Sequence, residues 1–427
     1  MVLLKKMRTA PWMMARAAIL LAAFFATQAQ ALPSFARQTG MDCAACHVGG
    51  FGPQLTPAGV MFKLTGYTDT DGKAQKIPLS AMILISKSRT AADQNPAPDH
   101  LNENNNVLMD EASIFLAGRL TENMGAFVQV THNGVDHSNS LDQADVRYAK
   151  AIEIGGKDAI VGLSVNNNPG VQDPFNSMPV WKFPFVKSPA GVGEGDATLI
   201  NGGLEGRVVG ASAYTLFDKA LYAELGSYHS MSPALQRRLG LGGEDQQRLG
   251  PNAYWRLAWF QDKKSQAYHV GAFGWSASLE PDRTVSAPRD KYNDVGIDGG
   301  YQFLGIREHI FTVNGSYVAE KKTAGATADV TRLKESRLNA SYFFNQTWGA
   351  SAGLFSTHGS DPLADSRGHL VQFDWTPWGK EASTAPDPFA WANIRLGAQY
   401  WIYNKFAGET ASAKDHNMLY LFAWTSF

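Results

Sequence analysis

The chain has 427 residues, a formal charge of −1 and only two cysteines. A near-neutral balance without a basic cluster in the body of the chain excludes nucleic acid as an expected partner. Two cysteines also exclude a disulfide framework beyond a single bond. The 41 glycines and the 11% aromatic content are typical of a β-rich exported protein.

Residues 1–31 have the pattern of a secretory signal peptide. A basic front is followed by the apolar run 17–26 and by the small-residue sequence Ala-Gln-Ala that ends at Ala31. An uncleaved membrane anchor is the alternative, but the apolar run is shorter than the about 20 residues that a spanning helix needs. We therefore predict export and cleavage after Ala31.

Residues 32–78 contain the pentapeptide Cys43-Ala-Ala-Cys46-His47. Two thiols at this spacing can form thioethers with both vinyl groups of a haem, and the adjacent imidazole can bind the iron. The motif predicts one covalent haem c, with Cys43 and Cys46 as attachment points and His47 as proximal ligand. A redox dithiol would normally lie in a βαβ pattern, which is missing here. Half of a zinc site would need a second cysteine pair.

The distal haem ligand is predicted less specifically. Residues 56–66 form a helix pattern in which Thr56 is the N-cap and Gly66 the stop signal. Met61 lies on this helix and is a candidate distal ligand, although simple apolar packing with Phe62 and Leu64 is the favoured interpretation. His132 is an alternative from the region that follows. Further candidates are His137 and Met41, and an open coordination position is also compatible with the sequence.

From Leu79 onward, short segments alternate between apolar and polar residues. In residues 393–402 the apolar side chains Ile394, Leu396, Ala398, Tyr400 and Ile402 fall on one face. A period of two with one apolar face predicts a strand with one apolar side. We count about sixteen such segments. They start near Ala81, Met109, Gly125, Asp142, Asp158, Leu204, Ala220, Asn252, Gln266, Asp294, Arg307, Glu335, Trp348, Gly368, Trp391 and His416.

The connections between these segments alternate in length. They are mostly tight after even-numbered segments and mostly long after odd-numbered ones, with residues 379–390 as an exception. An even number of about ten-residue strands with this alternation predicts a transmembrane antiparallel β-barrel of the bacterial outer membrane. The terminal Phe427 resembles the assembly signal of such barrels. A soluble sandwich or propeller is the competing architecture.

The longest connection, residues 166–203, carries four aromatic side chains, Phe175, Trp181, Phe183 and Phe185. Loops of this length are usually functional or disordered. We expect it to pack inward or over the barrel mouth, and a self-packed outer loop is the alternative.

Residues 33–47 (PSFARQTGMDCAACH) and 62–67 (FKLTGY) resemble the fused monohaem cytochrome–porins, the family of outer-membrane iron-oxidising cytochromes. The resemblance covers residues 33 to about 67, and beyond Leu79 it is one of architecture only. It implies a signal peptide (1–31), a haem-bearing segment with a short helix (32–78) that plugs or caps the barrel, and a barrel of about 16 strands (79–427). Haem-binding roles transfer to Cys43, Cys46 and His47, whereas the distal ligand does not.

The resulting hypothesis is an electron-transfer protein or Fe(II) oxidase in the outer-membrane lipid. It would take electrons from an extracellular donor, most plausibly Fe(II), and pass them to a periplasmic cytochrome or copper protein. A porin-like solute channel with a haem plug or gate is the alternative from a different class. A haem enzyme or sensor, which requires an open sixth coordination position, is a third interpretation.

Overall fold

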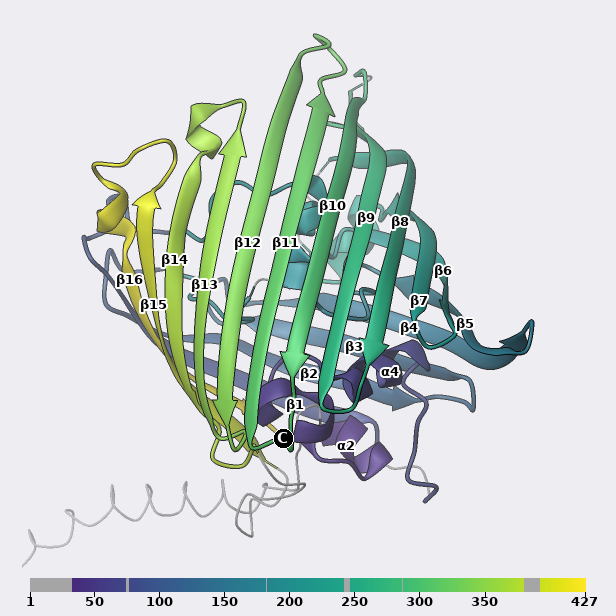
Figure 1. Ribbon diagram of the computed structural model, residues 1–427. Helices are drawn as coiled ribbons and strands as arrows, with labels where there is room; N and C mark the ends of the chain where they lie inside the picture. The colour runs from purple at the N-terminus through teal and green to yellow at the C-terminus, as the bar shows by residue number, and fades with distance from the viewer. Residues whose placement is uncertain (1–32, 74–76, 182, 242–245, 286, 380–391) are drawn as a thin grey trace, which may run out of the picture.

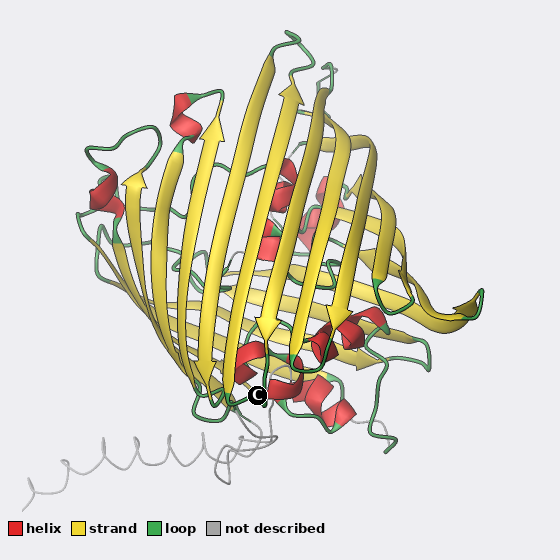
Figure 2. Cartoon of the chain, in the orientation of Figure 1, coloured by secondary structure: helices red, strands yellow, loops and turns green. Residues whose placement is uncertain are grey.

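The computed structural model describes residues 33–73, 77–181, 183–241, 246–285, 287–379 and 392–427. Sixteen antiparallel strands form a closed barrel in which β1 pairs with β16 (Figures 1 and 2). The predicted signal peptide lies outside the described residues. Among the residues that are described, no helix is long and apolar enough to cross a membrane.

The strands follow the chain in order around the barrel. They are β1 (Leu79–Thr90), β2 (Asn106–Arg119), β3 (Met124–Asn133), β4 (Ser138–Ile154), β5 (Lys157–Asn166), β6 (Val208–Phe217), β7 (Leu221–Ser230), β8 (Arg248–Asp262), β9 (Gln266–Glu280), β10 (Asp290–Phe303), β11 (His309–Thr323), β12 (Val330–Phe344), β13 (Trp348–Gly359), β14 (Ser366–Trp375), β15 (Asn393–Lys405) and β16 (Met418–Ser426). The predicted number of sixteen is confirmed. The largest offset between a predicted and an observed start is five residues, at β12.

Short helices occupy the N-terminal segment and several connections. They are α2 (Pro33–Thr39), α3 (Cys43–Cys46), η1 (Val48–Gly50), α4 (Pro57–Leu64), η2 (Pro179–Trp181), η3 (Leu199–Gly203), α5 (Pro233–Arg238), η4 (Pro362–Ala364) and η5 (Ala413–His416).

The barrel has apolar side chains outside, whereas its inner face combines polar side chains with an aromatic cluster that includes Tyr420, Phe422 and Trp424. On β15 the predicted apolar face points outward, while the alternating residues Arg395 and Gln399 are buried. On β12, Leu338 is 52% exposed, whereas Asn339 is buried. This is the reverse of a water-soluble barrel and is the pattern of a barrel that faces lipid. The alternation in sequence therefore predicted the faces correctly.

The two ends of the barrel differ. One end, here called the turn end, carries the connections after even-numbered strands, such as residues 120–123 and 155–156, and the chain terminus Phe427. The other, the loop end, carries the connections after odd-numbered strands. Of these, residues 134–137 between β3 and β4 are as short as a turn. Most of the predicted long exception after β14 lies outside the described residues.

Residues 33–67, which we call the plug, contain α2, α3, η1 and α4 and lie within the turn end (Figure 1). Helix α2 contacts β1 and β2 directly, and Ser34 Oγ lies 3.1 Å from Ser80 Oγ of β1. The Gln38 side chain accepts a 2.7 Å hydrogen bond from the backbone N–H of Arg119 on β2. The plug is thereby fixed to the wall next to the first strand.

Candidate functional site

The Cys43–His47 motif forms one compact turn. Its four-residue helix α3 is closed by a 2.8 Å hydrogen bond from His47 N–H to Cys43 O. His47 then pairs with Leu55 in an antiparallel bridge, which brings the chain back alongside the motif. A Cβ on Gly59 would lie 2.5 Å from Cys46 O, so only glycine allows α4 to approach this closely. The motif is thus held by helix α4 of the plug itself.

The predicted helix after the motif exists as α4, but its predicted cap behaves differently. Thr56 occupies the N-cap position without making a side-chain capping bond. Its hydroxyl instead donates a 2.5 Å hydrogen bond to Ala45 O within the motif. The threonine that the sequence marks as a helix cap therefore joins the helix to the Cys-x-x-Cys turn.

Cys43, Cys46 and His47 line one wall of a cavity of about 430 Å³. This cavity, called the plug cavity below, lies between three parts of the chain: the plug, the inner faces of β1–β4 and β16, and the connection between β5 and β6. Barrel residues on its wall include Met82, Glu111, Phe115, Phe127, Gln129 and Trp424. Its volume is within the range of about 300–1,000 Å³ typical of ligand pockets.

The protonation states in this cavity suit a ligand site better than a redox dithiol. Burial and, to a smaller extent, the neighbouring Cys43 together raise the pKa of the Cys46 thiol to about 11. Reactive dithiols instead have a lowered thiol pKa. Burial lowers the pKa of His47 to about 4, so its imidazole is neutral, as a metal ligand must be. The buried Nδ1 of His47 has no hydrogen-bond partner within the described chain.

Residues 167–207, called the inner loop, fold into the barrel and cover the plug. Lys63 of α4 donates hydrogen bonds to Val171 O at 2.6 Å, to Asp173 O at 2.8 Å and to Asn176 Oδ1 at 2.9 Å. Asn176 in turn donates to Pro53 O of the plug at 2.9 Å. The expectation that this connection packs inward is therefore confirmed.

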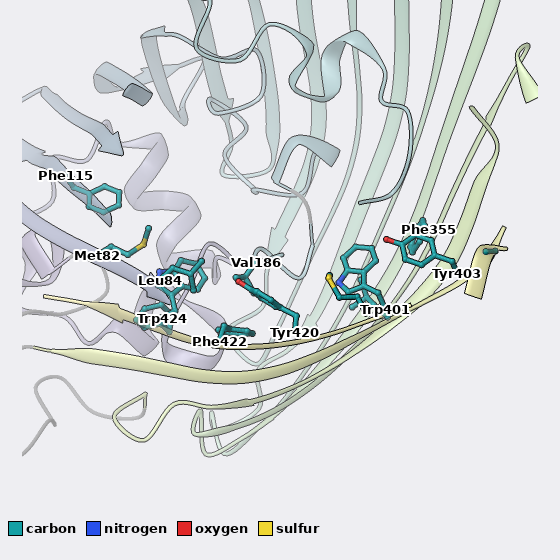
Figure 3. Packing of buried hydrophobic residues seen from close by; sticks show 14 of the residues in the cluster. Met82, Leu84, Phe115, Val186, Phe355, Trp401, Tyr403, Tyr420, Phe422 and Trp424 are labelled. Atoms are coloured by element: carbon teal, nitrogen blue, oxygen red, sulfur yellow. The ribbon is translucent and has the colours of Figure 1, made fainter. Parts of the chain in front are cut away.

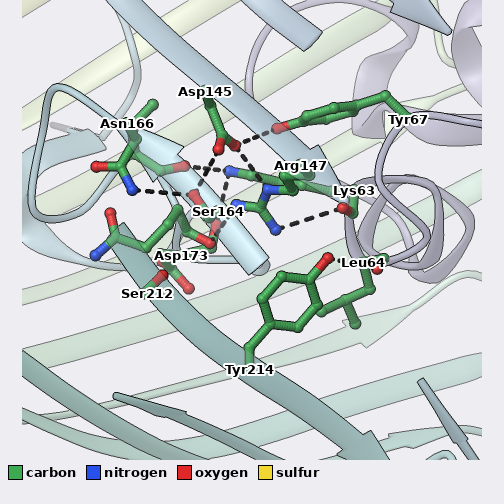
Figure 4. Close-up of polar contacts among 12 residues, drawn as sticks. Lys63, Leu64, Tyr67, Asp145, Arg147, Ser164, Asn166, Asp173, Ser212 and Tyr214 are labelled. Atoms are coloured by element: carbon green, nitrogen blue, oxygen red, sulfur yellow. Dashed lines mark hydrogen bonds and ion pairs between the residues drawn. The ribbon is translucent and has the colours of Figure 1, made fainter. Parts of the chain in front are cut away.

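A buried ion pair joins the plug, the wall and the inner loop (Figure 4). Arg147 and Asp145 of β4 lie 2.7 Å apart, and both side chains are fully buried. Tyr67 of the plug donates a 2.6 Å hydrogen bond to Asp145, and Arg147 donates to Gln172 O of the inner loop at 2.7 Å. Because an unpaired buried charge costs several kcal/mol, this pair fixes three elements at one point.

The opposite side of the plug contacts the turn end. Arg307, between β10 and β11, donates a 3.2 Å hydrogen bond to Ala44 O. Gln346, between β12 and β13, accepts one from Gly49 N–H at 3.1 Å. Asn393 of β15 donates to Gly50 O at 2.9 Å. The motif is thus surrounded by both halves of the barrel.

Two of the predicted distal ligands, Met61 and His132, lie elsewhere. Met61 packs against the apolar cluster around Leu55, Val60 and Leu64, and it is not among the residues that line the plug cavity. His132 lies at the loop end of β3, where its Nδ1 is 3.0 Å from Asn139 Oδ1. Met41, the further candidate, does line the cavity. Within the described residues, no group of three or more His, Cys, Asp or Glu side chains is placed to hold a metal ion.

Sequence reasoning missed the residues that seat the plug. Lys63 stands out in an apolar helix, and Asp145 and Arg147 share the polar face of one strand. Those were the available signals. Neither of them indicates which distant partner each residue meets.

No family model and no curated protein matches this chain. Its fold is similar to those of outer-membrane pores. The outer-membrane channel DcaP of Acinetobacter baumannii has a TM-score of 0.47 at 9% identity, and the match covers 82% of this chain and 96% of the DcaP chain. The anion-selective porin from Comamonas acidovorans has a TM-score of 0.45 at 9% identity, covering 82% and 98%. OmpT of Vibrio cholerae, with a loop deleted, has a TM-score of 0.44 at 8% identity, covering 82% and 97%. These values describe barrel architecture only, and no property of those proteins transfers to this chain.

Proposed function

We propose that this chain is a monohaem outer-membrane cytochrome that moves electrons from an extracellular donor, Fe(II) in the first instance, to a periplasmic carrier. The observation that carries the proposal is the plug cavity, whose wall brings Cys43, Cys46 and His47 together. In this proposal the turn end faces the periplasm, as short turns do in outer-membrane barrels. The loop end then faces the extracellular medium.

The residues present fit a covalent haem c. Cys43 and Cys46 would bind it through thioethers, and His47 would be the proximal ligand. A bound haem would supply one-electron redox chemistry. Phe51, Phe115, Phe127 and Trp424 give the cavity apolar surface. The neutral state of the buried His47 is compatible with a ligating imidazole.

The plug and the inner loop would have two tasks in this function. They would hold the Cys-x-x-Cys-His turn at a fixed depth in the barrel, through Lys63 and the Asp145–Arg147 pair. They would also obstruct the path of water and solutes through the lumen. A fixed, water-poor site reduces the reorganisation that accompanies a change of charge.

The test uses the full-length protein expressed with the enzymes that attach haem c. The mass of the purified protein should exceed that of the polypeptide by one haem, and the Cys46→Ala variant should not retain a haem bound through both thioethers. Fe(II) added to the oxidised protein should then reduce it, as seen in the visible spectrum. Reduction by dithionite but not by Fe(II) would leave a cytochrome with a different donor. An unmodified mass would refute the proposal.

A porin-like solute channel with the plug as gate is the second candidate. Its support is the barrel itself, whose inner face carries polar side chains such as Arg395, Gln399 and Asn339, together with the inner loop, which narrows the lumen. Single-channel conductance in planar bilayers separates the two functions. An electron conduit should remain nearly closed. A solute channel should conduct clearly in the intact protein.

A further inference from the structure

The plug cavity contains a second side chain suited to the iron, and it comes from the barrel rather than from the plug. We propose that Met82 of β1 is the distal axial ligand of the haem that Cys43, Cys46 and His47 would hold, so that barrel wall and plug bind the cofactor from opposite faces. This inference rests on the proposed function. It names a residue that neither the motif nor the family resemblance assigns.

Few soft metal ligands reach the plug cavity. Apart from the motif itself, the sulfur or imidazole side chains on the described cavity wall belong to Met41 and Met82. Met61 is directed into another cluster, and His132 is at the loop end of the barrel. Lys63 also lines the cavity, but its side-chain nitrogen is already hydrogen-bonded to three oxygens of the inner loop.

The two methionines differ in how closely the chain ties them to the motif. Met41 is two residues from Cys43, so a thioether at Cys43 would hold it near the edge of the porphyrin ring. An axial ligand has to lie over the centre of the ring, on the face opposite His47. Met82 belongs to a different element of the cavity wall, the inner face of β1, so its position is not tied to the motif by a short stretch of chain.

The barrel wall holds Met82 in place before any cofactor binds. Its backbone is paired on both sides, with Ser113 of β2 and Ser426 of β16. Its side chain is buried, with 8% exposed, and belongs to the cluster of Leu84, Phe115 and Trp424. Figure 3 shows Met82 between Phe115 on one side and Leu84 and Trp424 on the other. Phe35 of α2 packs against the same cluster, which connects it to the plug.

A thioether sulfur is a suitable ligand in such surroundings. It is soft and polarisable, and it needs no proton exchange to bind. Histidine–methionine coordination raises the reduction potential of haem iron. A high reduction potential would suit the proposed role, because the ferric haem would have to accept an electron from a weak reductant such as Fe(II).

The experiment compares three leucine variants of the full-length haem-loaded protein: Met82→Leu, Met41→Leu and Met61→Leu. Leucine keeps the side-chain volume and removes the sulfur. In Met82→Leu we expect loss of the weak far-red absorption of methionine-bound ferric haem. We also expect a fall in reduction potential and new carbon monoxide binding by the reduced protein. Met41→Leu and Met61→Leu should match the parent protein in all three measurements.

Met82→His is the second variant, because it restores a ligand at the same position. It should remain closed to carbon monoxide, with a potential below that of the parent protein. The inference is overturned if Met82→Leu retains the far-red absorption and the potential of the parent, or if Met41→Leu loses them instead. Absence of covalent haem from the parent protein would instead refute the proposed function, so the two failures are distinguishable.

Discussion

The hydrogen bond from Tyr67 to Asp145 offers a direct measure of how firmly the plug is seated. Replacing Tyr67 by phenylalanine removes one hydroxyl and leaves the ring, which is stacked on Phe35 at 5.4 Å between centroids. Asp145 keeps its bonds from Ser164 and Arg147, both at 2.7 Å. The carboxylate is therefore not left unpaired, and the change isolates one plug–wall contact.

The magnitude follows from the charge of the acceptor. A hydrogen bond to a charged group contributes about 1.5–3 kcal/mol. Loss of about 2 kcal/mol would shift the equilibrium between the seated and the unseated plug by about 30-fold. Backbone amides of residues 33–67 that exchange only when the plug leaves its seat should therefore exchange about 30-fold faster in Tyr67→Phe.

The assay is hydrogen–deuterium exchange of the detergent-solubilised full-length protein, followed by mass spectrometry. Tyr420→Phe is the matched control, because Tyr420 donates a bond of the same 2.6 Å length to a buried carboxylate, Asp110, within the barrel wall. This control should leave exchange in residues 33–67 unchanged. Unchanged exchange in Tyr67→Phe, or equal acceleration in both variants, would refute the assignment of this bond as a plug anchor.

Three further changes test the seat, the lipid face and the buried lysine. A Cβ on Gly50, where φ is +67°, would lie 2.2 Å from Gly379 O, so Gly50→Ala should displace the plug and accelerate its proteolysis. Gly72 has a similar φ of +76°, but a Cβ there would meet nothing within 4 Å. Gly72→Ala should therefore leave the proteolysis of the plug unchanged. Leu338→Arg on the lipid-facing side of β12 should destabilise the barrel by about 2–4 kcal/mol, measured by refolding into vesicles. Thr327→Arg, in the connection between β11 and β12, should have little effect on the same free energy. Burial lowers the pKa of Lys63 to about 7, from an ordinary value of 10.5. Between these values the unfolded chain binds the extra proton, so the free energy of unfolding should rise with pH through this window and be lowest below about 7. Lys63→Met should flatten the dependence of the guanidinium midpoint on pH, and an unchanged slope would contradict the assignment.

The barrel could be predicted from the sequence because its determinants are local. Alternation with a period of two fixes which side chains face lipid, and Leu338 and Asn339 show the two faces side by side. The tight and long connections likewise indicate the two ends. Register between strands needs little further information once the order is sequential, and here every strand pairs with its neighbour in the chain.

The plug could be predicted only in part, since its position depends on long-range contacts. The Cys43–His47 motif and the helix after it are visible in the sequence. The partners of Lys63, more than a hundred residues away in the inner loop, leave no local pattern. Met82 likewise leaves no local pattern: in the sequence it is one apolar residue of a strand, and only the structure places it on the cavity wall.

Three residues hydrogen-bond to the plug at the turn end and belong to the last third of the chain: Arg307, Gln346 and Asn393. During export the Cys43–His47 segment emerges long before them. In the finished barrel Cys43 is only 5% exposed, so a large enzyme cannot approach it there. Any enzymatic modification of these cysteines must therefore come before the late strands close. In the proposed function, the haem would therefore be attached first, and the barrel would fold around the loaded segment afterwards.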